Sequence, residues 1–281
     1  MSSRHGLGRR VIVHLTAYTV AITWTIPFLG VLMTAIRPVD EIANGWWQFQ
    51  QFHPSLQNFV NSLTGSVYSI PRGYLNSLIV AIPATLIPIF IGALAGYGFA
   101  RFSFPLRDYA FLTIVVMMAV PQQMVAIPIF QSMVDLNLVD TYLGLILLHT
   151  AWGLPWMILF MKNFFGTLPI EVEEAARVDG ASDFKIFFKI VLPLALPAVA
   201  SASVLQFMWV WNDFFFALIL ILSPDKLLAT QIVPKISTGA RYTDWGLLSA
   251  SSILVMLVPF LLYVLLQKYY IRGMVGWTVK G

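Results

Sequence analysis

The chain has 281 residues, of which 58% are hydrophobic and 11% are charged, and its formal net charge is +4. A mean hydropathy of +0.79 does not suit a water-facing surface, so the composition indicates an integral membrane protein and not a soluble domain. The basic residues gather at the ends of apolar runs, which indicates a topological role and not nucleic-acid binding, and the lack of cysteine excludes disulfides and thiolate sites.

The amino terminus superficially resembles a secretory signal, because Arg4, Arg9 and Arg10 precede an apolar run. That run extends over residues 11–35, which is too long for the apolar core of a signal, and it lacks a clear cleavage site of small residues. We therefore predict that it is retained as the first transmembrane helix.

Six apolar runs, each near the ~20 residues that cross the hydrocarbon as a helix, predict an all-α membrane protein with one transmembrane domain over residues 1–281. Their expected bounds are 11–35, 74–99, 109–133, 142–162, 196–222 and 246–268. Twelve lysines and arginines fall on the side of the amino terminus and five on the other side. Because cytoplasmic segments carry the basic excess, both termini and the 163–195 loop are expected in the cytoplasm.

Several residues within these runs are unusual at membrane depth. Gly92 and Gly96 are four apart, share a helix face and allow close helix contact. Gln122 and Gln123 lie between apolar residues, and their amides need protein or water partners. This helix should therefore face protein or a cavity, which makes the two glutamines candidate pathway residues.

Asp213 is the one acidic residue well inside an apolar run, and intramembrane carboxylates need a partner or a wet cavity. Together with Asn212 it is a candidate pathway or gate residue. A packing hydrogen bond with Asn212 or with a neighbouring subunit is an equally weighted alternative. His149 lies in the fourth run. A lone histidine there is more often a hydrogen-bonded packing residue than a proton carrier.

The densest charge lies in the stretch 169–197, whose local chemistry predicts two short helices joined by a bend. Acidic residues from Glu171 to Glu174 suit the positive end of a helix dipole, and Gly180 supplies the left-handed residue that commonly closes a helix. The residues alone fit an amphipathic hairpin on the membrane surface and a docking element equally well.

In the second of these helices, Ser182 and Asp183 can act as caps. Apolar residues then recur with helical spacing and predict one apolar face, and lysines share another. The apolar positions are Phe184, Phe187, Phe188 and Val191, and the lysines are Lys185 and Lys189. Pro193 and Pro197 should break or kink the chain that follows.

This stretch resembles the cytoplasmic EAA loop of permease subunits in binding-protein-dependent ABC importers. The matching residues are Glu174, Ala175, Ala176, Asp179, Gly180 and Ala181, followed by Ile190, Leu192, Pro193 and Pro197. The resemblance implies the type I importer permease fold and a coupling helix that docks in a cleft of an ATPase subunit. The final Val279, Lys280 and Gly281 resemble the tail of maltose-type second permease subunits, which contacts the ATPase dimer.

The resemblance further implies a carbohydrate importer for an oligosaccharide or glucoside in a bacterial or archaeal inner membrane. Its implied partners are a second homologous permease subunit, two ATPase subunits that hold ATP and magnesium, a soluble binding protein and membrane lipid. The outer segment 223–245 matches a loop that inserts toward the sugar pocket in the maltose family. Lys235 and Arg241 are therefore candidate contacts for the binding protein.

Motifs for chemistry on this chain are missing. The sequence has no G-x-x-x-x-G-K-[ST], no H-E-x-x-H, no G-x-S-x-G and no spaced metal cluster, so we expect a subunit that is not an enzyme and has no cofactor or metal of its own. One alternative is a self-contained secondary transporter or channel for a small polar solute. A more distant one is a membrane-anchored assembly protein that uses the loop only for docking.

Overall fold

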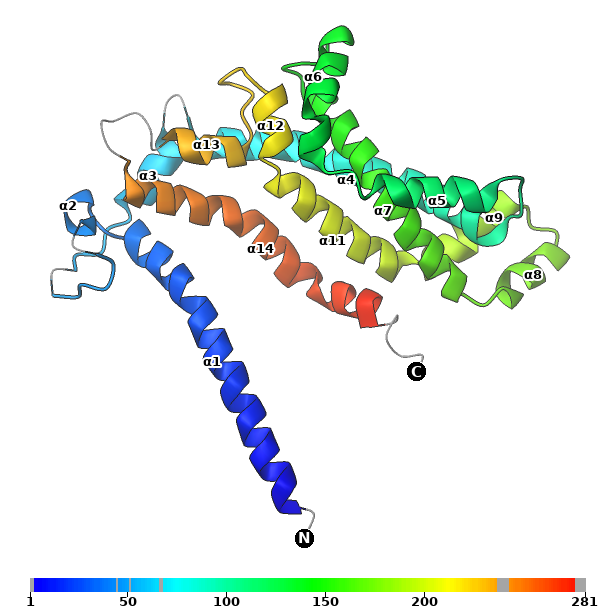
Figure 1. Ribbon diagram of the computed structural model, residues 1–281, viewed down its shortest axis with the longest axis horizontal. Coiled ribbons are helices and arrows are strands. Elements are labelled where there is room, and N and C mark those ends of the chain that lie inside the picture. The colour runs from blue at the N-terminus through cyan, green and yellow to red at the C-terminus, as the bar shows by residue number, and fades with distance from the viewer. Residues whose placement is uncertain (1–2, 44, 51, 66–67, 237–242, 276–281) are drawn as a thin grey trace. The chain divides into compact units, whose positions relative to one another are not determined.

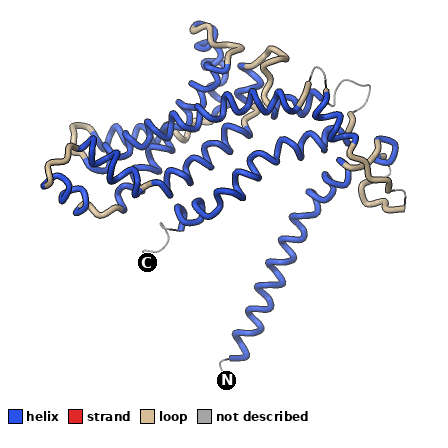
Figure 2. The backbone as a smooth tube through the Cα atoms, turned by 180° about the vertical axis from the view of Figure 1, so that it is seen from behind, coloured by secondary structure: helices blue, strands red, loops and turns tan. Residues whose placement is uncertain are grey.

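The computed structural model describes residues 3–43, 45–50, 52–65, 68–236 and 243–275, and these ranges hold helices and loops without a strand (Figures 1 and 2). The all-helical fold expected from the sequence is thereby confirmed. The chain divides into two compact units, Met1–Pro71 with Ile232–Met256 and Arg72–Gln231 with Leu257–Gly281.

The first unit begins with α1 (Ser3–Ala35), continues with α2 (Val39–Ile42) and α3 (Gln57–Thr64), and contains the start of α14 (Trp245–Val275). Only 6% of the apolar window of α1 is buried within the chain, so its apolar surface is left for lipid or another subunit. Buried polar groups join the other helices. The Ser62 hydroxyl on α3, for example, lies 2.9 Å from that of Ser251 on α14.

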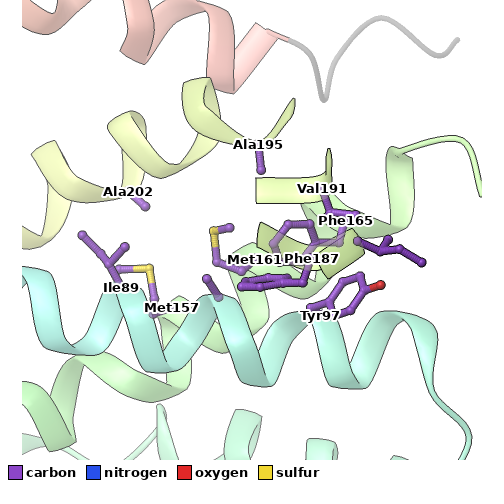
Figure 3. Close-up of a cluster of buried hydrophobic side chains, with 11 residues drawn as sticks. Ile89, Tyr97, Met157, Met161, Phe165, Phe187, Val191, Ala195 and Ala202 are labelled. Carbon is purple, nitrogen blue, oxygen red and sulfur yellow. The ribbon is translucent and has the colours of Figure 1, made fainter. Parts of the chain in front are cut away.

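The second unit is built around a core to which α4, α7 and the chain from α9 to α11 contribute (Figure 3). Its helices are α4 (Ile70–Arg101), α5 (Arg107–Met117), the 3₁₀ turn η1 (Gln122–Val125), α6 (Ala126–Asp135), α7 (Tyr142–Thr167), α8 (Glu171–Val178), α9 (Asp183–Ile186), the π-helical η2 (Phe187–Val191), α10 (Leu192–Leu194), α11 (Leu196–Asn212), α12 (Phe215–Leu220) and the start of α13 (Ala229–Ile236). Tyr97 lies at one end of this core with its ring 5.8 Å from that of Phe165 and 5.1 Å from that of Phe187.

A buried amide joins three helices of this unit. Pro88 has no N–H to donate to the Ala84 carbonyl one turn earlier in α4. The side chain of Gln206 on α11 donates to that carbonyl at 3.2 Å and accepts a hydrogen bond from the Trp156 indole of α7 at 2.8 Å. Gly153 makes room for it, because a Cβ there would lie 2.5 Å from the Gln206 amide nitrogen. Gln206 thus compensates for the proline, and α4 continues through it.

Four helices in the described part of the chain are long and apolar enough to cross a membrane, or up to six if each bent pair counts as one span. The segment 109–133, expected as one helix, is instead divided between α5 and η1–α6, which meet at 93°. Pro121 at this break cannot donate a backbone hydrogen bond and disfavours helical backbone at the preceding residue. The segment 196–222 is likewise divided, because α11 ends at Asn212 and α12 begins at Phe215.

Candidate functional site

The helix α8 ends in the backbone conformation that the sequence predicts. Gly180 has a φ of +80°. Its N–H donates to the Arg177 carbonyl, and the N–H of Ala181 donates to the Ala176 carbonyl, both at 3.0 Å. This hydrogen-bond pattern is a Schellman motif, in which glycine is favoured at the left-handed position. The expected conformation of Gly180 is therefore confirmed.

The residues of the EAA resemblance divide between two sides of this turn. Four are exposed, namely Glu174, Ala175, Asp179 and Gly180, and two pack partly buried against the core, namely Ala176 and Ala181. Val178 beside them is 88% exposed. The turn thus packs against the core of the unit through the small side chains of Ala176 and Ala181. The carboxylates of Glu174 and Asp179 and the apolar side chain of Val178 stay exposed. α8 lies beyond the end of α7 (Figure 1).

Glu173 fixes α8 to the end of α4. Its carboxylate is buried, lies 2.6 Å from Nε of Arg101 and accepts a hydrogen bond from the Tyr97 hydroxyl at 2.8 Å. The guanidinium of Arg101 also donates to the Leu168 carbonyl at 2.9 Å. Sequence reasoning treated Glu173 only as charge at a helix start and missed this contact. The available signal was a basic residue, Arg101, at the end of the second apolar run.

The second helix of the loop differs from its predicted form. Ser182 caps α9 as expected, because its hydroxyl accepts the Lys185 N–H at 3.4 Å. However, α9 changes after four residues into the π-helical η2, and the prediction that Phe184 shares the apolar face is wrong, since Phe184 is 71% exposed. The wider turn shifts the helical period, so that the buried positions are Ile186, Phe187 and Val191.

Asp213 lies at the break between α11 and α12, where its carboxylate is buried. It accepts backbone N–H groups of Phe216 at 3.3 Å and Ala217 at 3.0 Å, which caps α12. Its other near contact is Nε2 of His149 on α7, 3.5 Å away. His149 is 1% exposed and packs edge-on against Phe216. The hydrogen-bond partners of the buried carboxylate are thus at the start of α12 and not on Asn212, and His149 lies close to it although Nε2 has no hydrogen bond to the described residues.

The other candidate pathway residues form no hydrogen bond with Asp213 or His149 in the described part of the chain. Asn212 is exposed and donates to the carbonyl of Met208 in its own helix. Gln122 is half-buried and Gln123 exposed, both in η1, and neither side chain has a hydrogen bond to the described residues. An apolar cavity of about 290 Å³ lies beside this turn, between the α5–η1–α6 break and α7, lined by residues that include Met118, Val125 and Trp152.

A second polar cluster holds the chain that follows α12. The carboxylate of Asp140, in the loop before α7, accepts N–H groups of Leu222 and Ser223 at 2.9 Å each and the ammonium of Lys226 at 3.0 Å. It also accepts a hydrogen bond from the Ser223 hydroxyl. Burial by itself raises the pKa of Asp140, but the donors of Ser223, Leu222 and Lys226 outweigh it and hold that pKa well below its ordinary value of 3.8.

We expect Asp140→Asn to destabilise the chain near pH 7 by about 2 kcal/mol, because charge-assisted hydrogen bonds are lost. A carboxylate with a lowered folded pKa contributes stability above its unfolded pKa and loses it as pH falls through the folded value. The difference from the unmodified chain should therefore shrink below about pH 3.9. Thermal unfolding in detergent between pH 7 and pH 3 measures it. The exposed Asp108, replaced by Asn, is the control, and an equal loss in both variants would contradict the role of Asp140.

The remaining candidate residues are only partly within the described chain. Lys235 is half-buried in α13. Arg241 and the tail residues Val279, Lys280 and Gly281 lie outside the described residues. Their expected contacts with a binding protein and an ATPase stay predictions.

Comparison with known proteins places this geometry in a family. The family profile described as binding-protein-dependent transport system inner membrane component matches residues 88–276. A probable ABC transporter permease protein of Pyrococcus horikoshii is 52% identical over 97% of this chain and 98% of its own length. An α-glucoside transport system permease protein of Rhizobium meliloti is 40% identical over 81% of this chain and 60% of its own length.

Among solved structures, a bacterial ABC transporter involved in the import of the acidic polysaccharide alginate matches with a TM-score of 0.81 over 96% of this chain and 99% of that one. At 21% identity this likeness concerns the fold, which is that of an importer permease. The expected type I permease fold is thereby confirmed. With the family profile covering most of the chain and a relative more than half identical along nearly its whole length, the chain belongs to the inner-membrane permease components of binding-protein-dependent ABC transport systems.

Proposed function

We propose that this chain is a permease subunit of an ATP-driven importer that moves a carbohydrate, an oligosaccharide or glucoside, across the cell membrane. The observation that carries the proposal is the α8 turn, in which a Schellman ending at Gly180 presents an uncovered surface from a loop between membrane helices. The α-glucoside permease relative supports the substrate class. The chain itself hydrolyses no ATP.

The complex contains a second permease subunit, two ATPase subunits that bind ATP and magnesium, and a soluble binding protein. The α8 turn, called the coupling helix from here on, docks on an ATPase subunit, and both termini lie in the cytoplasm. ATP can shift the permease between inward- and outward-facing states only through differential affinity for the two, so ATP binding favours the outward-facing state. Residues 279–281 reach the ATPase dimer.

The outer face receives sugar from the binding protein at the segment 223–245. The hydrogen bonds that the Asp140 carboxylate accepts support this assignment, because they hold the start of the segment in one conformation. Lys235 and Arg241 lie farther along it and contact the binding protein. Crosslinking from either position to the binding protein tests the contact, and products formed only with lipid or the second permease would contradict it.

Purification of the tagged chain from its native membrane tests the assembly. An ATPase with a P-loop should copurify, and the complex in proteoliposomes should take up a labelled sugar from a panel of maltose, trehalose and glucosylglycerol only with ATP and a binding protein present. Uptake by the chain alone, driven by an ion gradient, would instead support the secondary transporter.

Two substitutions of Asp213 distinguish a role in the transport pathway from a role in packing. Asp213→Asn keeps an acceptor for the N–H groups of Phe216 and Ala217, whereas Asp213→Leu leaves them unsatisfied at a cost of about 1–3 kcal/mol each. If Asp213 lines the pathway, uptake by the Leu variant falls much further than the amount of assembled complex, and the Asn variant retains more uptake. Equal losses of uptake and assembly would mean that Asp213 acts only as the cap of α12.

A further inference from the structure

We propose that α4 carries movement of the coupling helix to the outer segment 222–229, with Glu173 and Asn76 as the positioning residues at its two ends. The inference rests on the proposed function and adds the route by which the ATPase side and the outer side communicate. The route is a continuous helix with buried polar contacts at each end, which is the kind of physical connection that coupling between distant sites uses.

The inner contact is the buried carboxylate of Glu173. It is 1% exposed, and both of its partners, Tyr97 and Arg101, belong to α4. Breaking such a pair leaves an uncompensated charge in a buried site, which is more costly than moving both helices together. A displacement of the coupling helix therefore displaces the end of α4 with it.

The outer contact is made by two neighbouring side chains at the other end of α4. The amide of Asn76, 5% exposed, donates to the carbonyl of Asp225 at 3.0 Å and to that of Leu227 at 2.9 Å. The Ser77 hydroxyl accepts the N–H of Ala229 at 2.9 Å. These side chains satisfy backbone groups of the turn before α13 and of Ala229, the first residue of α13, so the position of this segment follows that of α4.

The part of α4 between the two contacts can transmit a displacement. Asn76 and Arg101 are about 37 Å apart at 1.5 Å per helical residue. This separation exceeds the ~30 Å hydrocarbon, so the contacts act on opposite sides of the membrane. Pro88 does not interrupt α4, because Gln206 satisfies the Ala84 carbonyl that the proline leaves without a donor.

The competing route runs through α7. Asp140 fastens the same outer segment to the loop before α7, and α7 leads through Leu168 into the coupling helix. The Leu168 carbonyl is itself held by Arg101 of α4, so that the inner end of α7 also depends on α4. Asp140→Asn and Asn76→Ala distinguish the two routes, because each releases the outer segment from one helix.

The experiment uses the complex with its ATPase subunits in proteoliposomes and a single cysteine at the exposed Asp225, since the natural chain has none. The rate at which a membrane-impermeant maleimide modifies Asp225→Cys is measured without nucleotide and after trapping with ATP and orthovanadate. The ratio of the two rates is the response, so that a change in basal exposure cancels. The parent for this experiment is the complex that carries Asp225→Cys and no other substitution. We expect a response of about fivefold or more in this parent, which is in the range of allosteric couplings.

Glu173→Gln and Asn76→Ala should each reduce the response to below about twofold, because variants along a coupling network weaken the coupling between two sites. The double variant should lose no more of the response than either single variant. Tyr97→Phe removes one hydrogen bond from the inner contact and should give an intermediate response. The controls Asp108→Asn and Asn61→Ala make the same chemical changes at exposed sites and should retain the parent response, as should Asp140→Asn.

A parent-like response in Asn76→Ala, or in both Glu173→Gln and Tyr97→Phe, would overturn the proposal. So would a response lost in Asp140→Asn, or losses that add in the double variant. If Glu173→Gln does not assemble, Tyr97→Phe and Asn76→Ala still decide. A parent that traps nucleotide but shows no response also refutes the route. Failure of the parent to assemble with any ATPase would instead refute the proposed function.

Discussion

Replacing Gly96 with leucine should prevent α4 from packing on α7 and sharply reduce the yield of folded chain. A Cβ at Gly96 would lie 2.8 Å from the backbone nitrogen of Lys162 and 2.8 Å from Cβ of Met161. Backbone cannot rotate away as a side chain can, so the two helices would have to separate. Overpacking of this kind costs about 3 kcal/mol or more when the site cannot relax, and the loss would extend to the core around Met161.

Gly98 is the matched control, because it lies two residues along the same helix and a Cβ there meets no atom within 4 Å. Gly98→Leu should therefore fold like the parent. Detergent-extracted protein of both variants, compared by size-exclusion yield and by the midpoint of thermal unfolding, measures the difference. Equal yields and midpoints would show that α4 and α7 tolerate separation at Gly96.

Features whose causes are local in sequence could be predicted. Gly180 and Ser182 behave as expected, because a left-handed helix ending and a cap need only the residues beside them. The paired glycines also indicated close helix contact, although not which helix would be the partner. Hydropathy alone was sufficient for the class of fold.

Contacts between distant residues could not be predicted in the same way. Glu173 and Arg101 are 72 positions apart, and Asp140 and Ser223 are 83 apart, so neither local pattern nor composition pairs them. Asp213 is an intermediate case. Its need for a partner was predicted, but treating 196–222 as one helix concealed the break in which it caps α12.

Gly180→Val should disconnect ATP hydrolysis from transport while leaving the membrane helices folded. At a φ of +80°, a residue with a Cβ costs about 1–2 kcal/mol, and a β-branched residue is especially unsuited. A Cβ there would meet no atom within 4 Å, so the penalty comes from the backbone alone. The turn relieves it by giving up the hydrogen bonds of Gly180 and Ala181, which moves the exposed residues of the coupling helix.

Such a cost corresponds to roughly a tenfold weaker association with the ATPase. Gly166→Val is the matched control, since Gly166 lies in α7 with open space around its Cα and without a left-handed φ. Gly180→Asn should retain most function, because asparagine tolerates the left-handed region. ATPase copurification, sugar-stimulated hydrolysis and uptake are measured together in reconstituted membranes. Parent values of all three for Gly180→Val would mean that this turn is a surface helix and that coupling runs elsewhere.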